Sequence, residues 1–205
     1  MELGSGFLAI EGGEGAGKST FVKDLVKQLS QSAEVVVTRE PGGTVLAEQI
    51  RGLILNGPCA LSAEAEMWLF AAARRDHVNE VIRPALEAGK VVICDRFIGS
   101  TWAYSGAQGQ LSDNVIQAAC DWGSDGLTPE KTIYLDVTVE QGLARAGKRA
   151  ALDAIESRPM RFHERVRDRY LARAYADSSW IKVDASGTPQ DTFERFLKAI
   201  SESEG

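Results

Sequence analysis

The stretch that decides the fold is FLAIEGGEGAGKS, which occupies residues 7–19. Residues 7–11 are mostly apolar and predict a short strand. Residues 12–19 match the pattern G-x-x-x-x-G-K-[ST]. Apolar residues then recur at helical spacing, which predicts an amphipathic helix carrying Val22, Leu25, Val26 and Leu29 on one face. A strand, a glycine-rich loop and a helix in this order are the context that a phosphate-binding loop (P-loop) requires.

The residues of this loop predict its chemistry. Glycines let backbone N–H groups converge on phosphate oxygens, and the start of the following helix adds a partial positive charge. We expect Lys18 to reach the β- and γ-phosphates and Ser19 to ligate Mg²⁺. A flexible glycine turn without a ligand is the alternative interpretation. The phosphates of a nucleoside triphosphate are thus expected to bind Gly12, Gly13, Glu14, Gly15, Ala16, Gly17, Lys18, Ser19 and Thr20.

Further short apolar runs alternate with helical patterns along the chain. They predict strands at residues 34–39, 91–95, 131–135 and 179–183. Strands that regularly follow helices imply parallel pairing, and continuously apolar strands are typical of sheets covered on both faces. The predicted fold is therefore an α/β, doubly wound five-stranded parallel sheet with helices on both faces. No repeat or linker divides the chain, so a single domain over residues 1–205 is expected.

Composition excludes several classes of protein. The chain has 205 residues, of which 44% are hydrophobic, and it carries a net charge of −6. This balance disfavours disorder, a nucleic-acid partner and an anionic membrane surface. The longest apolar run, residues 68–73, is far below the ~20 residues of a membrane span. A soluble, cytoplasmic protein is expected.

Three separated cysteines without a CxxC pair disfavour zinc and disulfide frameworks and predict reduced, mostly buried thiols.

Local signals add detail to this outline. Residues 97–109, rich in Gly, Ser and aromatic residues, predict a binding loop. Residues 142–169 are densely basic, which fits either a solvated helix face or phosphate contacts. Thr138 with Gln141, and Thr188 before a proline, predict helix N-termini. A second amphipathic helix is predicted around Leu46, Ile50, Leu53 and Ile54.

A P-loop alone does not identify the reaction. A GTPase needs an N/T-K-x-D element, and the nearest run, residues 181–184, lacks the Asn or Thr. A motor or AAA-type ATPase needs a longer chain and an acidic pair at the end of a strand, whereas the strand at residues 91–95 ends in one carboxylate, Asp95, followed by one cation, Arg96. That pair suits an enzyme that holds Mg²⁺ and a second phosphate together.

Four blocks of sequence carry a family resemblance: residues 11–20, 38–44 (TREPGGT), 70–74 (FAAAR) and 95–104 (DRFIGSTWAY). With residues 134–137 and the basic segment, they resemble the bacterial thymidylate kinases, P-loop nucleoside monophosphate kinases with a helical lid. The resemblance implies Mg²⁺- and ATP-dependent phosphorylation of dTMP to dTDP, and a homodimer. A kinase for another monophosphate, or a non-catalytic P-loop nucleotide-binding protein, are the alternatives.

The resemblance also implies roles at the acceptor site. Phe70 would stack on the pyrimidine, and Arg74, one helical turn further on, would donate to thymine O4. Arg96 would clamp the dTMP phosphate, while Asp95 would hold Mg²⁺ through water. Glu11 would reach the sugar or the metal-bound water, or else be a buried carboxylate satisfied by backbone donors. The remaining acceptor contacts are expected from Arg39, Glu40, Ser100, Thr101, Tyr104 and Ser105.

Two features concern the lid and the base. One branch of the family has an arginine inside the P-loop where this chain has Gly15, so the cation for the transferring phosphoryl group is expected from a lid at about residues 142–160. Arg149 is ranked first for this catalytic role and Arg145 second. Ser105 stands where the family usually has a base-reading glutamine, and whether Ser105 or Gln108 replaces it stays open.

Overall fold

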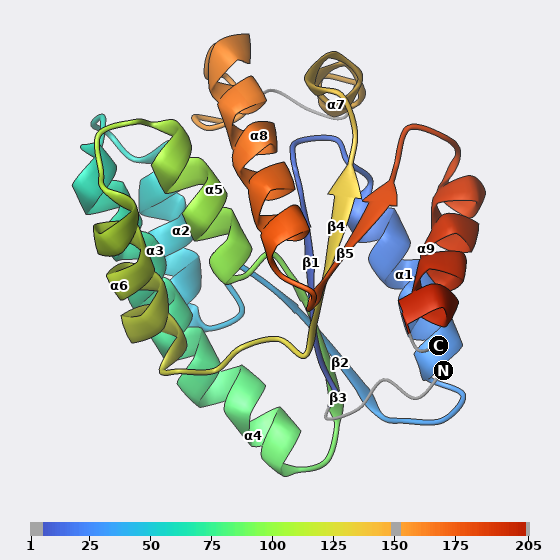
Figure 1. The fold of residues 1–205 in the computed structure, drawn as a ribbon. Coiled ribbons are helices and arrows are strands. Elements are labelled where there is room, and N and C mark those ends of the chain that lie inside the picture. The colour runs from blue at the N-terminus through green and yellow to red at the C-terminus, as the bar shows by residue number, and fades with distance from the viewer. Residues whose placement is uncertain (1–5, 149–152, 204–205) are drawn as a thin grey trace.

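The computed structural model describes residues 6–148 and 153–203 (Figure 1). Its strands are β1 (Phe7–Gly12), β2 (Val35–Arg39), β3 (Val91–Asp95), β4 (Lys131–Asp136) and β5 (Trp180–Asp184). Its helices are α1 (Lys18–Leu29), α2 (Val45–Asn56), α3 (Ala63–His77), α4 (Arg83–Glu87), α5 (Ile98–Ala107), α6 (Asp113–Ser124), α7 (Val139–Ala146), α8 (Met160–Ala176) and α9 (Pro189–Ser203). A π-helical turn, Val78–Ile82, joins α3 to α4.

The strands form one parallel sheet in the order β2-β3-β1-β4-β5. The predicted strands are confirmed to within one residue at each end. In the register, Asp95 at the end of β3 lies beside Ile10 of β1 and Arg39 of β2. The carboxyl ends of these strands therefore meet at one edge of the sheet, where open α/β sheets bind ligands.

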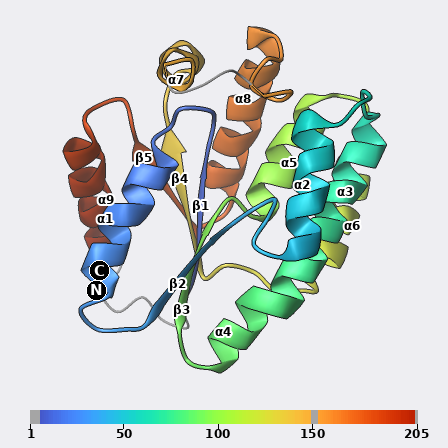
Figure 2. The ribbon, with the colours of Figure 1, turned by 180° about the vertical axis from the view of Figure 1, so that it is seen from behind.

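Helices cover both faces of the sheet, as predicted (Figures 1 and 2). On one face, Leu8 and Ile10 pack with α1 and α9 in a core cluster. On the other, Phe7 and Ala9 pack toward the remaining helices, because neighbouring residues of a strand point to opposite faces. The stripe predicted on α1 is confirmed, since Val22, Leu25 and Leu29 are buried.

Residues 97–109 do not form the predicted loop. Most of them belong to α5, and the small residues that suggested a loop allow close packing instead. A Cβ atom on Gly99 would collide with the Trp180 ring and the Glu11 carboxylate, and one on Gly106 would overlap the Arg169 guanidinium. Glycine is therefore retained within this helix despite its cost in helix propensity, because α5 lies against α8 and the end of β1.

Of three further local predictions, one is confirmed and two are partly confirmed. On α2, Ile50 and Ile54 are buried, but Leu46 and Leu53 are 48% and 52% exposed. Thr188 caps α9 and accepts a hydrogen bond from the Asp191 N–H. Thr138 caps α7, but the Gln141 side chain donates to the Ser186 carbonyl and does not close the capping box.

The basic residues of 142–169 mostly contact protein rather than open solvent. Arg158 pairs with Glu66, Arg167 with Asp136, and Arg169 with Asp113. Arg165 donates to the Ala107 carbonyl. These four residues tie α8 and the segment before it to the rest of the fold. Arg165 is also exposed and the other three are partly exposed, so the solvated helix face is partly confirmed, and the phosphate contacts stay a prediction.

Cys94 and Cys120 are buried, Cys59 is exposed, and all three are free thiols, as predicted. Within residues 6–148 and 153–203, every helix is too short or too polar to span a lipid bilayer.

The packing of α9 on α1 gives a stability prediction. Phe196 is 0% exposed and meets Phe21 edge to face, with ring centroids 5.0 Å apart. Phe196→Ala should lower the free energy of unfolding by ~3–5 kcal/mol, because it leaves a cavity in the core. Leu197→Ala, at a neighbouring site that is 38% exposed, should cost about 1 kcal/mol or less. Urea unfolding at 25 °C measures both, and equal losses would contradict the core role of Phe196.

Candidate active site

A cavity of about 610 Å³ opens at the carboxyl edge of the sheet. The P-loop, the ends of β2 and β3, helices α3 and α5, and the loop between β5 and α9 border it. Most of the residues singled out from the sequence line this cavity: Glu14, Gly15, Ala16, Gly17, Lys18, Ser19, Thr20, Arg39, Glu40, Phe70, Arg74, Asp95, Arg96, Ser100, Thr101, Tyr104 and Arg145.

The Lys18 side chain folds back onto the backbone of the P-loop. The Lys18 ammonium donates to the carbonyl oxygens of Gly12 and Gly13, each at 3.1 Å. Gly15 has φ +65°, and a Cβ there would overlap the Gly142 carbonyl of α7. A side chain at position 15, including the arginine of the other family branch, has no room in this arrangement.

Arg96 is the most connected cation of the site. It follows β3 directly with φ +72°, a left-handed conformation that costs a non-glycine residue of order 1–3 kcal/mol. This conformation turns its guanidinium toward the P-loop, where it donates to the Gly12 carbonyl at 3.0 Å and to the Glu14 carboxylate at 2.9 Å. The Arg96 guanidinium also lies over the Tyr104 ring, 5.0 Å from its centroid.

Glu14 is the anionic partner of this arginine. Its Oε1 atom also accepts a hydrogen bond from the Tyr104 hydroxyl at 2.6 Å. Burial by itself would raise the pKa of Glu14, but the charges of Arg96 and Lys18 and the Tyr104 hydrogen bond outweigh it and hold the pKa at about 2. Arg96 is thus neutralised by the protein at the place where an anionic ligand would lie.

Glu11 is a buried structural carboxylate in this arrangement. It is 0% exposed and does not line the cavity. It accepts hydrogen bonds from the backbone N–H groups of Phe97 and Ser100 and from the hydroxyls of Ser100 and Tyr170. Burial raises its pKa, while these donors oppose the rise. The alternative of a carboxylate satisfied by protein donors describes Glu11, which holds the start of α5 against β1.

Arg74 is 2% exposed and held at two of its three guanidinium nitrogens. Its Nε atom donates to Glu40 Oε2 at 2.6 Å, and its Nη2 atom donates to the Phe97 carbonyl at 3.0 Å. Arg75, its neighbour, pairs instead with Asp125 and lies over the Trp122 ring. The two arginines thus face different surroundings, as expected from their positions on the helix.

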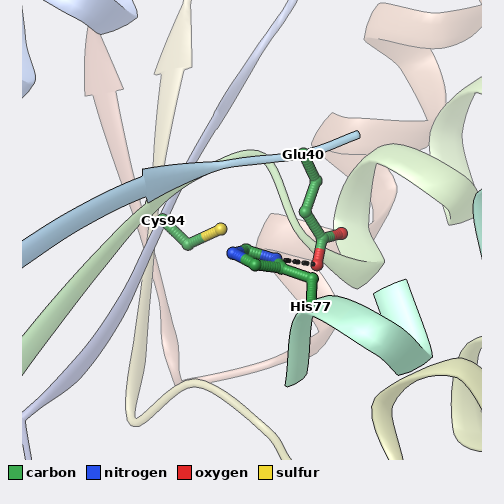
Figure 3. Close-up of side chains that lie close together, drawn as sticks. All are labelled: Glu40, His77 and Cys94. Carbon is green, nitrogen blue, oxygen red and sulfur yellow. Dashed lines mark hydrogen bonds and ion pairs between the residues drawn. The ribbon is translucent and has the colours of Figure 1, made fainter. Parts of the chain in front are cut away.

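Three potential metal ligands lie together behind Arg74: Glu40, His77 and Cys94 (Figure 3). Their ligand atoms all lie within 4.8 Å of one another and are buried. Each already has a protein partner. Both His77 nitrogens are hydrogen-bonded, and the Cys94 thiol donates to the Arg96 carbonyl at 3.0 Å. Burial and the nearby carboxylates raise the pKa of Cys94, which favours the thiol over a metal-binding thiolate. The hydrogen-bonding atoms of all three residues are thus already engaged by other protein groups.

Unpartnered polar atoms mark the space where a ligand would bind. Four buried side-chain atoms in the described residues have no hydrogen-bond partner: Arg74 Nη1, Asp95 Oδ1, Thr101 Oγ1 and His163 Nε2. The first three belong to residues that line the cavity. A buried polar atom without a partner costs roughly 1–3 kcal/mol. Their convergence on one cavity is the arrangement that a polar ligand would satisfy.

Some residues predicted for the site lie outside the cavity or are engaged by other protein groups. Ser105 is buried but does not line the cavity, and the Gln108 side chain donates to Glu66. Arg145 lines the cavity, but its guanidinium donates to the carbonyls of Ala185, Ser186 and Gly187. Arg149 lies outside the described residues.

Sequence reasoning missed other residues that line the cavity: Arg51, Leu55, Asp153, Ile155 and Glu156. Arg51 of α2 donates to the Pro41 carbonyl at 3.0 Å. Its position one turn before Leu55 on the same helix face was the available signal, but nothing in the sequence placed α2 at the cavity.

The Glu14–Arg96 pair predicts a pH dependence of stability. The folded-state pKa of Glu14 lies below its ordinary value of 4.5, so the pair stabilises the fold above pH 4.5 and loses this contribution as pH falls toward about 2. Glu14→Gln should therefore lower the free energy of unfolding by ~2–3 kcal/mol at pH 7 and by much less near pH 2.5. Urea unfolding across this range checks it, with the exposed Glu164→Gln as control. A difference between parent and Glu14→Gln that does not change with pH would contradict the ion pair.

Comparisons with known proteins agree with this geometry. The family model described as thymidylate kinase matches residues 10–195. A thymidylate kinase of Bradyrhizobium sp. is 49% identical over 202 residues, covering 96% of this chain and 89% of that protein. One of Protochlamydia amoebophila is 42% identical over 207 residues, covering 96% and 92%. The crystal structure of thymidylate kinase from Ehrlichia chaffeensis superposes with a TM-score of 0.76 at 31% identity, covering 95% of this chain and 98% of that one. The chain belongs to the thymidylate kinase family.

Proposed function

We propose that this chain transfers the γ-phosphoryl group of ATP directly to dTMP, giving ADP and dTDP without a covalent enzyme intermediate. One observation carries the proposal beyond family membership. The cavity joins a P-loop to a second set of polar groups, and the unpartnered atoms of Arg74, Asp95 and Thr101 belong to this second set. A P-loop protein that only bound nucleotide would have no need of them.

The donor side consists of the P-loop and the start of α1. Lys18, whose ammonium now rests on the loop carbonyls, would move a short distance to the β- and γ-phosphates. The backbone N–H groups of residues 13–20 would donate to the phosphate oxygens, and the N-terminus of α1 would stabilise their charge. Catalysis by such a site is mainly positioning and electrostatic stabilisation.

Mg²⁺ is part of the proposal because two residues fit it. Asp95 presents a buried carboxylate oxygen without a protein partner, and Ser19 lies on the cavity wall at the start of α1. Oxygen ligands of this kind suit Mg²⁺, which usually keeps several of its waters. When bound, the ion would neutralise phosphate charge, while Asp95 and Ser19 would hold it directly or through water.

The acceptor side follows from the remaining lining residues. Arg96 would exchange its contact with Glu14 for the dTMP phosphate, since both are anions. Phe70 would stack on the base, Arg74 Nη1 would donate to thymine O4, and Thr101 and Tyr104 would line the base and the deoxyribose.

Residues 142–160 are proposed as a lid that supplies a cation to the transferring phosphoryl group. The hydrogen bonds of Arg145 to the β5–α9 loop occupy its guanidinium, which supports Arg149 as that cation. If Arg145 were the cation, it would have to leave three carbonyl partners.

A homodimer and a cytoplasmic location complete the proposal. Exposed apolar side chains on neighbouring helices support the dimer: Leu46 and Leu53 of α2, Trp68 of α3, and Val115 and Trp122 of α6. The rings of Trp68 and Trp122 lie 6.3 Å apart, so they form one continuous surface.

A panel of acceptors separates the rival functions. ADP release is measured with dTMP, dCMP, dUMP and dGMP in the presence of ATP and Mg²⁺. We expect the highest kcat/KM with dTMP, in line with the family to which the chain belongs. The value with dCMP should be lower, because an arginine donates to O4 of thymine but would oppose the N4 amine of cytosine. The highest value with another monophosphate would assign the chain to a different acceptor. No turnover with any acceptor would favour the non-catalytic P-loop protein.

Lys18→Ala should abolish turnover without unfolding the protein, because a phosphate ligand at a cavity wall contributes to transition-state charge and little to the core. Lys23→Ala, at an exposed position on the same helix, is the matched control and should keep parental activity. Coupled ADP-release assays and thermal melts of the three proteins provide the measurement. A Lys18→Ala enzyme within tenfold of the parent would rule out the P-loop assignment.

A further inference from the structure

We propose that His77 is a positioning residue for base selection: it orients the Glu40 carboxylate and, through it, the guanidinium of Arg74. The inference rests on the proposed role of Arg74 at the thymine base. His77 is 0% exposed and does not line the cavity, so it acts through other residues rather than on the substrate.

The ring of His77 connects β2 and its following loop to Arg74. His77 and Arg74 stand three residues apart on α3 and so share a helix face. The His77 Nε2 atom lies 2.6 Å from Thr38 Oγ1, and its Nδ1 atom lies 3.1 Å from Glu40 Oε1. Figure 3 shows the ring directed edge-on at the Glu40 carboxylate.

Only one arrangement of protons on a neutral ring satisfies these contacts. A carboxylate accepts hydrogen bonds and cannot donate them, so Nδ1 must carry the proton that faces Glu40. Nε2 is then an acceptor, and the Thr38 hydroxyl donates to it. The chain of donors runs from Thr38 through His77 to Glu40, whose other oxygen accepts from Arg74 Nε at 2.6 Å.

This chain limits where the free nitrogen of Arg74 can lie. The guanidinium is planar, and two of its nitrogens are held by Glu40 and by the Phe97 carbonyl. The direction of Nη1 is therefore determined by Glu40 and the Phe97 carbonyl together. Without the Nδ1–H of His77, the carboxylate has one partner fewer and can rotate, and Nη1 loses its fixed position opposite the base.

Two substitutions of His77 by amide side chains distinguish the contact made by Nδ1 from the contact made by Nε2. Asn at position 77 carries an N–H at the place of Nδ1 and keeps the contact with Glu40, whereas Gln places its amide near Nε2 and keeps only the contact with Thr38. KM for dTMP, kcat, and the ratio of kcat/KM for dTMP over dCMP are measured for parent, His77→Asn and His77→Gln. Met67→Ala, fully buried on the same helix but outside the cavity, is the control for simple destabilisation.

We expect His77→Gln to raise KM for dTMP by about tenfold with kcat within about threefold, because base contacts bind ground and transition states alike. The dTMP to dCMP ratio should fall by a similar factor. His77→Asn should stay within about threefold of the parent on both measures. Met67→Ala should lower the melting temperature and leave the ratio unchanged.

Combining His77→Gln with Arg74→Ala tests whether the effect passes through Arg74. The double variant should have the same ratio as Arg74→Ala alone, since the residue that His77 orients is already absent. A further fall of the dTMP to dCMP ratio in the double variant would overturn the inference, and so would an unchanged ratio in His77→Gln. Neither result would affect the proposed function as long as the parent phosphorylates dTMP. A parent that phosphorylates no monophosphate would contradict the proposed function, and with it this inference.

Discussion

The site depends on one arginine in a left-handed conformation. Arg96 follows strand β3, which lies beside the central strand β1, and has φ +72°. Its backbone N–H donates to the Ile10 carbonyl of β1. From this point its guanidinium reaches the P-loop carbonyl of Gly12 and the carboxylate of Glu14. The backbone strain is thus compensated by contacts that join the two halves of the cavity.

Around this arginine, charges are buried in pairs. Glu14 neutralises Arg96, and Glu40 neutralises Arg74 at 2.6 Å. Uncompensated, such groups would destabilise the fold by several kcal/mol each. Pairing leaves the cations in place in the absence of nucleotide, so a ligand meets a preformed site and does not have to order it. An incoming phosphate would compete with Glu14 for Arg96, which exchanges one anion for another at small electrostatic cost.

The sequence predicted those features that depend on local patterns. The strands, the helix after the P-loop and the sheet type follow from periodicity, and the P-loop follows from its spacing and context. Residues 97–109 were misassigned because Gly99 and Gly106 serve a long-range purpose, close packing against Trp180 and Arg169, which a local pattern does not contain. Glu11 and Gln108 carry chemically suitable groups, but their partners come from distant elements. Thr38, Glu40 and His77 lie in or beside the family motifs, yet only the folded chain shows that they contact one another.

The central claim is that Arg96 binds the phosphate of the acceptor, and titration calorimetry with dTMP and thymidine tests it most directly. The two ligands differ only in the phosphate, so the ratio of their dissociation constants isolates that contact. The parent should bind dTMP more tightly than thymidine by about tenfold or more, as expected for a charge-assisted hydrogen bond. In Arg96→Met this preference should largely disappear while thymidine binding stays near the parental value, which also shows that the base site remains folded. An unchanged preference for dTMP in Arg96→Met would contradict the account.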